Sequence, residues 1–225
     1  MRPTFWFLTT LVKVGTNIMC RIDASDLHKV PKSGPLIVYS NHTGLIEVPL
    51  IFAHLQPRPV KGIAKVETWD GWFLRWVFNV WDAIPIRRGE ADLTAMRVSL
   101  EALEKRFIVG ISPEGTRNKT GMLIKGHPGI ITLALRSKAP LLPIVHWGGE
   151  NFSKNLKRLK RTDFHIRVGE PFKLHPGDER VTKDVRQQMV DEMMYRMAAM
   201  LPEYYRGAYS DLENATQKYI SNPHP

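Results

Sequence analysis

The chain has 225 residues, with 32 Lys and Arg against 22 Asp and Glu, and so carries a formal net charge of +10. This length suits one folded domain that buries about 70% of its unfolded surface, and a second full domain is not expected. Hydrophobic residues make up 43% and charged residues 24%, which excludes a chain that is disordered throughout. A basic surface attracts polyanions, but the charge alone does not distinguish nucleic acid, anionic lipid and phosphorylated small molecules.

The N-terminal stretch has a positive charge followed by a short apolar run, which raises the question of a signal peptide. Thr9 and Thr10 interrupt the run, and no small-x-small cleavage site precedes Asp23. We therefore expect no export. The single cysteine, Cys20, cannot form an internal disulfide, which fits a reducing cytosol, and we expect it to be a small buried apolar group. Because no run of about 18 apolar residues occurs, no membrane-spanning helix is expected.

Short β-rich runs alternate with helical patterns along the chain. Apolar residues spaced three and four apart predict one helix between residues 93 and 107 and a long helix between residues 181 and 197. Strands are expected over residues 36–39, 60–64, 83–86, 107–111, 141–146 and 164–168. This alternation predicts an α/β fold, a single domain with a central, mostly parallel β-sheet flanked by helices. The polar stretch after Pro202 is expected to be loosely held.

The sequence S-N-H-T-G-L-I-E lies where the strand 36–39 ends and a helix begins, and Pro49 suits the first turn of that helix. On one regular helix His42 and Glu47 would face different sides, so they meet only if His42 lies in the loop and Glu47 in the first turn. The carboxylate would then accept the Nδ1–H bond and leave Nε2 to remove a proton from a hydroxyl. Alternatively, both are ordinary capping and hydrogen-bonding residues.

Two further segments are candidates for an anion site. In the sequence I-S-P-E-G-T-R-N, Gly115 lets the backbone approach a ligand, Arg117 offers a forked phosphate contact, and Lys125 beyond it offers a point charge. Arg87 and Arg88 follow the strand 83–86 in the same way. The alternative for each segment is a tight turn with solvent-exposed charges.

Taken together, these segments resemble the glycerolipid acyltransferases, the 1-acyl-sn-glycerol-3-phosphate acyltransferases that make phosphatidic acid from lysophosphatidic acid. The resemblance runs from about residue 36 to residue 144 and implies a glycerol-phosphate acyltransferase-like α/β fold. Its four blocks are residues 41–47 (N-H-T-G-L-I-E), 84–89 (I-P-I-R-R-G), 113–117 (P-E-G-T-R) with Lys125 and Gly126 beyond, and 139–143 (A-P-L-L-P).

The resemblance implies a role for each block. His42 would be the catalytic base and Glu47 its orienting acid, while the second and third blocks bind the acceptor phosphate and the fourth is associated with the acyl donor. The implied phosphate-binding residues are Arg88, Glu114, Gly115, Thr116, Arg117 and Lys125. Lys65 resembles a lysine near the reacting carbonyl, so Lys65 and Arg87 are candidates for an oxyanion or second phosphate contact.

The chain departs from the family pattern at two positions. Glu47 stands where the family usually has Asp, so the carboxylate has one extra methylene and must be set back or rotated to reach His42. Arg87 precedes Arg88 where the second block often reads Asp-Arg, which makes the acceptor side more cationic. The identity of the acceptor therefore stays open.

We expect an O-acyltransferase that moves a fatty acyl group from acyl-CoA or acyl-carrier protein to the hydroxyl of lysophosphatidic acid, in phospholipid biosynthesis and without a cofactor. Other acceptors, namely glycerol 3-phosphate, a monoacylglycerol or another lysolipid, are the nearest alternative. A non-catalytic membrane- or lipid-binding protein is an alternative of another class. Nucleic-acid binding ranks third because no recognised module accompanies the basic residues. No metal site is expected, since His127, His146, His165 and His175 lack metal-ligand spacing.

Five of the six tryptophans lie in two stretches, residues 5–12 and 69–81. Because Trp favours lipid interfaces, we expect peripheral binding at the cytoplasmic face of a membrane, the alternative being that both stretches pack on the core. The expected division is a membrane-interface segment (1–30), an acyltransferase domain (31–202) and a polar tail (203–225). The cationic run from Lys154 to Arg161 either attracts anionic lipid or is a solvated face.

Overall fold

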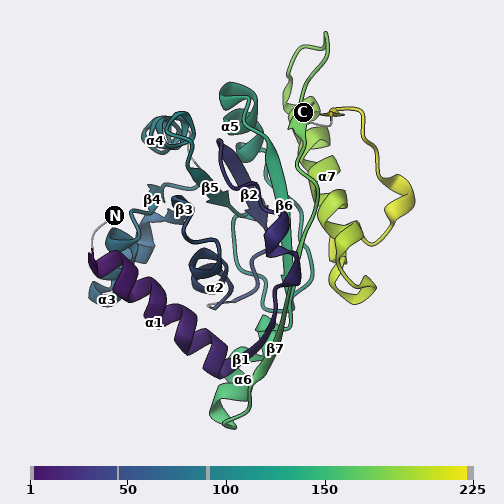
Figure 1. The fold of residues 1–225 in the computed structure, drawn as a ribbon. Coiled ribbons are helices and arrows are strands. Elements are labelled where there is room, and N and C mark those ends of the chain that lie inside the picture. The colour runs from purple at the N-terminus through teal and green to yellow at the C-terminus, as the bar shows by residue number, and fades with distance from the viewer. Residues whose placement is uncertain (1–2, 45, 90–91, 222–225) are drawn as a thin grey trace.

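Helices and strands alternate along residues 3–44, 46–89 and 92–221, which are the residues that the computed structural model describes (Figure 1). The α-helices are α1 (Pro3–Met19), α2 (Glu47–His54), α3 (Trp72–Val80), α4 (Leu93–Glu104), α5 (Gly129–Ser137), α6 (Phe152–Lys157) and α7 (Lys183–Met200). The strands are β1 (Cys20–Asp23), β2 (Leu36–Ser40), β3 (Val60–Lys65), β4 (Ile84–Ile86), β5 (Ile108–Ile111), β6 (Leu141–Trp147), β7 (Thr162–Val168), β8 (Lys173–Leu174) and β9 (Ile220–Ser221). The short 3-10 helices are η1 (Ser25–Lys29), η2 (Val66–Trp69), η3 (Gly149–Asn151), η4 (Glu203–Tyr205), η5 (Gly207–Tyr209) and η6 (Leu212–Asn214).

In the described ranges seven strands form one sheet in the order β1-β7-β6-β2-β5-β3-β4. Every neighbouring pair is parallel except β6 and β7, which are antiparallel. A separate antiparallel pair joins β8 to β9. The sheet is therefore mostly parallel, as the alternation of strands and helices predicts.

Helices cover both faces of the sheet, so its central strands are apolar on both sides. Leu36 and Val38 of β2 join the core under α1, α2 and α3, whereas Ile37 and Tyr39 join the core under α4, α5 and α7. Figure 1 shows the two layers, with α1, α2 and α3 on one side of the sheet and α7 on the other. Two apolar cores thus hold the strand ends in fixed positions.

The predicted strands are confirmed with boundaries that shift by one or two residues, and both predicted helices are present as α4 and α7. β1 is a strand that was not predicted, and it pairs with β7 from Cys20↔Thr162 to Asp23↔His165. It has only four residues, carries charges at Arg21 and Asp23, and follows a helix directly, so no strand pattern develops. Cys20 is fully buried, as expected.

The C-terminal segment is not loosely held up to residue 221, contrary to expectation. Tyr209 and Tyr219 are buried in the core beside α7. The buried carboxylate of Glu192 accepts bonds from the Thr216 hydroxyl at 2.6 Å and from the Lys218 and Tyr219 N–H groups at 2.8 and 3.0 Å. The polar composition of this segment gives no sign of these buried contacts. Residues 222–225 of the expected tail, and residues 1 and 2 of the expected N-terminal segment, lie outside the described residues.

The N-terminal helix and α3 each bury one apolar face and expose another. α1 buries Phe5 and Leu8, and α3 buries Val77. Their exposed large apolar side chains are Trp6, Phe7, Leu11, Val14, Ile18, Trp72, Phe73, Leu74 and Trp76. Packing on the core thus accounts for the apolar residues on one side of each helix but not for the exposed ones. Within the described ranges, no helix combines the length and apolarity that crossing a membrane requires.

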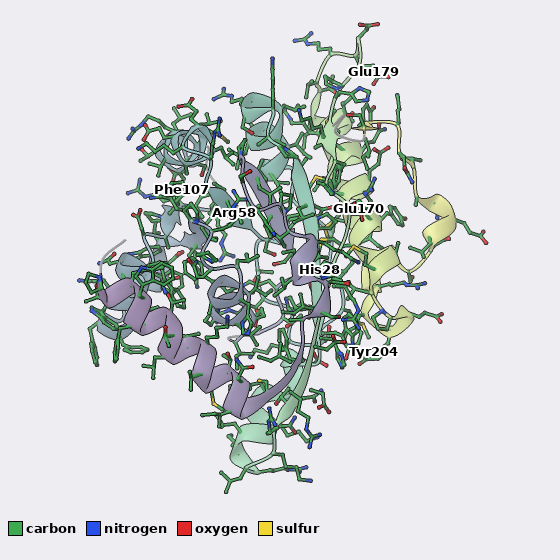
Figure 2. All side chains as sticks on the ribbon, in the orientation of Figure 1. His28, Arg58, Phe107, Glu170, Glu179 and Tyr204 are labelled. Atoms are coloured by element: carbon green, nitrogen blue, oxygen red, sulfur yellow. The ribbon has the colours of Figure 1, made fainter. Side chains whose placement is uncertain are left out.

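At the amino ends of the strands, the buried Arg58 fastens two loops. Its guanidinium donates to the carbonyls of Pro31 and Arg106 at 2.6 and 3.0 Å and also to that of Gly34. Figure 2 shows Arg58 close to Phe107, which immediately precedes β5. This arginine stabilises the end of the sheet where β2 and β5 begin.

Candidate active site

The predicted site residues follow the carboxyl ends of neighbouring parallel strands. His42 follows β2, Glu114 follows β5, Lys65 ends β3 and Arg88 follows β4. These strands are adjacent in the order β2-β5-β3-β4, and the ends of parallel strands meet at one edge of a sheet. The topology therefore gathers residues that are up to 72 positions apart in the chain, from 42 to 114.

His42 and Glu47 form a hydrogen-bonded pair at this edge. Nδ1 of His42 lies 2.7 Å from Oε1 of Glu47, and the N–H of Gly44 donates to the same oxygen at 2.8 Å. His42 lies in the loop and Glu47 is the first residue of α2, the arrangement under which the two were predicted to meet. The longer Glu side chain therefore reaches the imidazole. Because a carboxylate only accepts, Nδ1 carries the proton and Nε2 is left to act as a base.

The environment keeps Glu47 ionised although its side chain is only 1% exposed. Burial by itself would raise the pKa of Glu47, but the hydrogen bonds with His42 and with the Gly44 N–H outweigh burial and lower the pKa to about 2. A carboxylate that stays charged at neutral pH orients the imidazole and stabilises it when it takes up a proton.

The loop after β5 is joined to the loops on either side of it. The N–H of Asn118 donates to the carbonyl of His42 at 2.8 Å, and the guanidinium of Arg88 donates to the carbonyl of Gly115. Gly115 has a φ of +64°, and a Cβ there would lie 3.1 Å from Cδ2 of His127, so the position requires glycine. The first, second and third sequence blocks therefore meet in the fold.

Glu114 occupies the interior of this loop instead of facing solvent. Its side chain is buried, and in the described part of the chain neither carboxyl oxygen has a hydrogen-bond partner. Burial raises the pKa of Glu114 to about 8; the nearby backbone N–H of His42 opposes this rise in part, and the charge of Glu47 adds to it. At neutral pH Glu114 is consequently protonated and uncharged. In this state it does not repel an anion that binds at the loop.

The remaining predicted phosphate contacts lie at the surface. Thr116, Arg117, Lys125, Arg87 and Lys65 are exposed. Among the described residues, no hydrogen bond or ion pair occupies the side chains of these five. Four of the five, all except Thr116, are positively charged and lie near the edge at which His42 lies, and an arrangement of this kind attracts an anionic substrate.

Asn41, the residue before His42, is fixed to β6 by the buried His146, for which the sequence predicted only that it binds no metal. The Asn41 side chain donates to the His146 carbonyl at 2.8 Å and accepts from the His146 N–H at 3.0 Å. Nε2 of His146 donates to the Asn41 carbonyl at 2.7 Å. One signal was available, because a histidine inside the apolar run L-L-P-I-V-H-W must find a hydrogen-bond partner.

No group of three or more His, Cys, Asp and Glu residues within residues 3–44, 46–89 and 92–221 is arranged to hold a metal ion. The groups available for chemistry at this edge are the imidazole of His42, the ionised carboxylate of Glu47, the protonated carboxyl group of Glu114 and the exposed Lys and Arg side chains. A base held by a carboxylate, beside cations that attract an anion, is suited to activating the hydroxyl of a phosphorylated acceptor.

Comparison with known proteins agrees with this chemistry. Residues 21–147 match the model of the family described as Acyltransferase. The chain belongs to the acyltransferase family. The match contains the His42–Glu47 pair, both arginines of the second block, the third-block loop and His146, so the region from β1 to β6 carries the family relationship.

The relatives of this acyltransferase include named enzymes from bacteria and animals. It is 26% identical over 176 residues to the 1-acyl-sn-glycerol-3-phosphate acyltransferase of Bacillus subtilis, covering 76% of this chain and 83% of that one. It is 28% identical to the human 1-acyl-sn-glycerol-3-phosphate acyltransferase alpha, covering 81% of this chain, and 30% identical to the bovine enzyme of that name, covering 76%. The chain spans only 64% and 62% of those two longer proteins.

The fold of this acyltransferase is also found in a solved structure. The 1-acyl-sn-glycerophosphate acyltransferase PlsC from Thermotoga maritima superposes with a TM-score of 0.63 at 20% identity, covering 84% of this chain and 76% of that one. The expected fold and the expected family are therefore confirmed.

Proposed function

We propose that this acyltransferase transfers a fatty acyl group from an acyl thioester to the hydroxyl of lysophosphatidic acid and so produces phosphatidic acid. The 2.7 Å contact between His42 Nδ1 and Glu47 Oε1 carries the proposal, because it supplies a base beside a cationic edge. The names of the relatives, which specify 1-acyl-sn-glycerol-3-phosphate, support this choice of acceptor.

The reaction follows from the orientation of the base. Nε2 of His42 removes the proton of the acceptor hydroxyl while the oxygen attacks the thioester carbonyl, and Glu47 stabilises the resulting imidazolium. Collapse of the tetrahedral intermediate breaks the C–S bond, and the leaving thiolate takes the proton back from Nε2. The products are an ester and a free thiol, and His42 is regenerated.

No acyl-enzyme is needed in this mechanism, since the acceptor oxygen attacks the thioester directly. The chain has one cysteine, Cys20, and it is fully buried at the start of β1. We therefore propose a ternary complex with acyl-CoA or acyl-carrier protein as donor and no cofactor.

The acceptor phosphate would bind among the exposed cations of the edge. Arg88 and Arg117 offer forked contacts and Lys125 a point charge, while Thr116 and the Gly115 backbone lie on the same loop. Lys65, at the end of β3, would stabilise the developing oxyanion, and Arg87 would add a second cation. Glu114 would support the loop from beneath as an uncharged acid.

Peripheral membrane binding through α1 and α3 is part of the proposal. Both helices present exposed aromatic and aliphatic side chains in water, and tryptophan is suited to the membrane interface. A lysophospholipid acceptor lies in a membrane, so this docking would bring the site to its substrate.

The test is an assay of purified protein with palmitoyl-CoA or palmitoyl-acyl-carrier protein and a panel of acceptors, following thiol release and lipid products. The acceptors are lysophosphatidic acid, glycerol 3-phosphate, a monoacylglycerol and other lysophospholipids. His42→Ala should lose at least about 1,000-fold in rate. His175→Ala, an exposed histidine on the β8 side of the fold, should keep wild-type activity. No product with any acceptor and either donor would favour a non-catalytic lipid-binding protein.

A further inference from the structure

A basic turn lies between α6 and β7, formed by residues 157–161 (K-R-L-K-R). At its centre Leu159 is 94% exposed and has a φ of +54°. A leucine rarely adopts this left-handed backbone, because its Cβ crowds the following carbonyl. A side chain so exposed gains no packing that would offset the strain. For the folded chain by itself, leucine is a poor residue at this position.

The hydrogen bonds of the basic turn identify the residue that would suit it. The Leu159 N–H donates to the Leu156 carbonyl at 3.0 Å, and the Lys160 N–H donates to the Asn155 carbonyl at 2.9 Å. This pair of bonds is a Schellman motif, in which glycine commonly occupies the left-handed position. A leucine in place of that glycine indicates a side chain that contacts something outside the fold.

Cations without carboxylate partners surround this leucine. Lys154, Lys157, Arg158 and Lys160 are exposed, and none of them forms an ion pair with a carboxylate of the described residues. Arg161 instead donates to the carbonyls of Asn17 and Cys20 at 2.7 and 2.5 Å. The turn is thereby fastened to the C-terminal end of α1.

The basic turn adjoins the C-terminal end of α1, a helix with an exposed apolar side. The exposed residues Phe7, Leu11, Val14 and Ile18 form one stripe along this helix of 17 residues, which is about 25 Å long. Figure 1 shows α3 beside the N-terminal part of α1 and α6 beside the opposite end. The indole of Trp81, just after α3, donates to Thr9 of α1 at 3.3 Å. The aromatic side chains of α3 and the basic turn thus lie near opposite ends of α1.

We infer that the basic turn binds anionic phospholipid headgroups and places Leu159 in the membrane interface, as the second end of the contact that α1 and α3 make. The inference rests on the peripheral binding in the proposed function and adds a lipid preference to it. Lysines and arginines complement anionic headgroups, and an exposed leucine among them suits the acyl boundary beneath. The exposed apolar stripe of the adjoining α1 favours a membrane over an acidic protein as the occupant.

Vesicle flotation tests the inference, using phosphatidylcholine alone and phosphatidylcholine with about 30% phosphatidylglycerol. Leu159→Gly removes the apolar side chain and relieves the strained backbone, so the variant should fold at least as well as the wild type. We expect it to bind mixed vesicles about 5-fold more weakly. Leu93→Ala, an exposed leucine at the start of α4, is the matched control and should bind normally.

The charges are tested by the triple change Lys157→Gln, Arg158→Gln and Lys160→Gln. It should abolish the preference for phosphatidylglycerol, lowering binding to mixed vesicles about 10-fold or more. The control triple Lys105→Gln, Lys173→Gln and Lys183→Gln alters the net charge equally at exposed positions elsewhere. If both triples weaken binding equally, the net charge and not the basic turn attracts the lipid, and the inference is wrong.

Two further results separate this inference from the proposed function. If the wild type floats with neither kind of vesicle, peripheral binding itself fails and the inference fails with it. If it floats equally well with both and the turn variants match it, only the inference fails. In neutral detergent micelles the turn variants should keep wild-type turnover with palmitoyl-CoA. A selective loss with palmitoyl-acyl-carrier protein, with flotation unchanged, would assign the turn to the carrier protein and overturn the inference.

Discussion

Asn41 and His146 are joined by three hydrogen bonds across the β2–β6 pair, two from the Asn41 side chain to the His146 backbone and one from the imidazole to the Asn41 carbonyl. Burial lowers the pKa of His146, which favours the neutral ring that donates from Nε2. Both the side chain and the backbone carbonyl of Asn41 are thereby held in place, and His42 is the next residue. Under the proposed mechanism, His146 therefore acts as a positioning residue that holds the residue before the base.

Replacing His146 therefore should affect turnover more than substrate binding. His146→Leu keeps the backbone bonds but removes the bond from Nε2, and kcat should fall about 10-fold with little change in KM. His146→Gln, whose amide can donate to the same carbonyl, should recover most of the loss. Steady-state kinetics on both variants check this. A raised KM at unchanged kcat would instead place the effect on substrate binding.

The charge and the length of the Glu47 side chain should make separate contributions to kcat. Glu47→Gln still accepts the Nδ1–H bond but does not neutralise the imidazolium, so kcat should fall about 100-fold or more. Glu47→Asp restores the usual family residue but draws the carboxylate back from its position 2.7 Å from His42, and kcat should fall about 10-fold. Both are measured as kcat beside the thermal midpoint of each protein. An Asp variant as fast as the wild type would show that the longer side chain is not matched to this site.

Glu114 should make stability decrease with rising pH. Its pKa is raised from the ordinary 4.5 to about 8, so between these values the folded protein binds more protons than the unfolded chain. The free energy of unfolding therefore falls as pH rises through this window, and the loss is complete above pH 8. Glu114→Gln has no such titration. The free energy of unfolding of this variant, relative to that of the wild type, should therefore rise by up to about 3 kcal/mol as the pH is raised from about 5.5 to about 8.5.

Urea unfolding at the two pH values measures this difference. Glu170→Gln is the control, since Glu170 is exposed, as Figure 2 shows beside α7. It should change stability equally at both pH values. The same relative stability of Glu114→Gln at both values would mean that Glu114 is ionised in the folded protein.

The aromatic residues of α3 should dominate binding to neutral vesicles. Trp72 and Phe73 are 83% and 53% exposed, and changing both to Ser removes apolar area that would enter the interface. Flotation with phosphatidylcholine should drop about 10-fold, and the paired change of Trp6 and Phe7 to Ser should lower it as well. Tyr204→Ser is the control, because Tyr204 is exposed on a different part of the surface (Figure 2). Unchanged flotation of both pairs would contradict docking through α1 and α3.

The strands of the sheet were predictable because local sequence carries their signal. Strands covered by helices on both faces become continuous apolar runs, such as L-I-V-Y in β2 and L-L-P-I-V in β6. The order and spacing of the blocks from Asn41 to Pro143 likewise identified the family before any contact was known, and they predicted His42 as the base. The condition for the dyad, His42 in a loop and Glu47 in a first turn, follows from helical geometry alone.

Other features depend on residues brought together from distant parts of the chain. The tie between Asn41 and His146 spans 105 positions, and the bonds of Glu192 with residues 216–219 hold a segment that reads as a polar tail. The raised pKa of Glu114 arises from burial, which the same Pro-Glu-Gly turn would lack at an exposed site. Local pattern determined the strands and the family and predicted the pairing of His42 with Glu47. Only tertiary packing decided which polar groups are buried, because burial and hydrogen-bond partners are properties of the assembled layers.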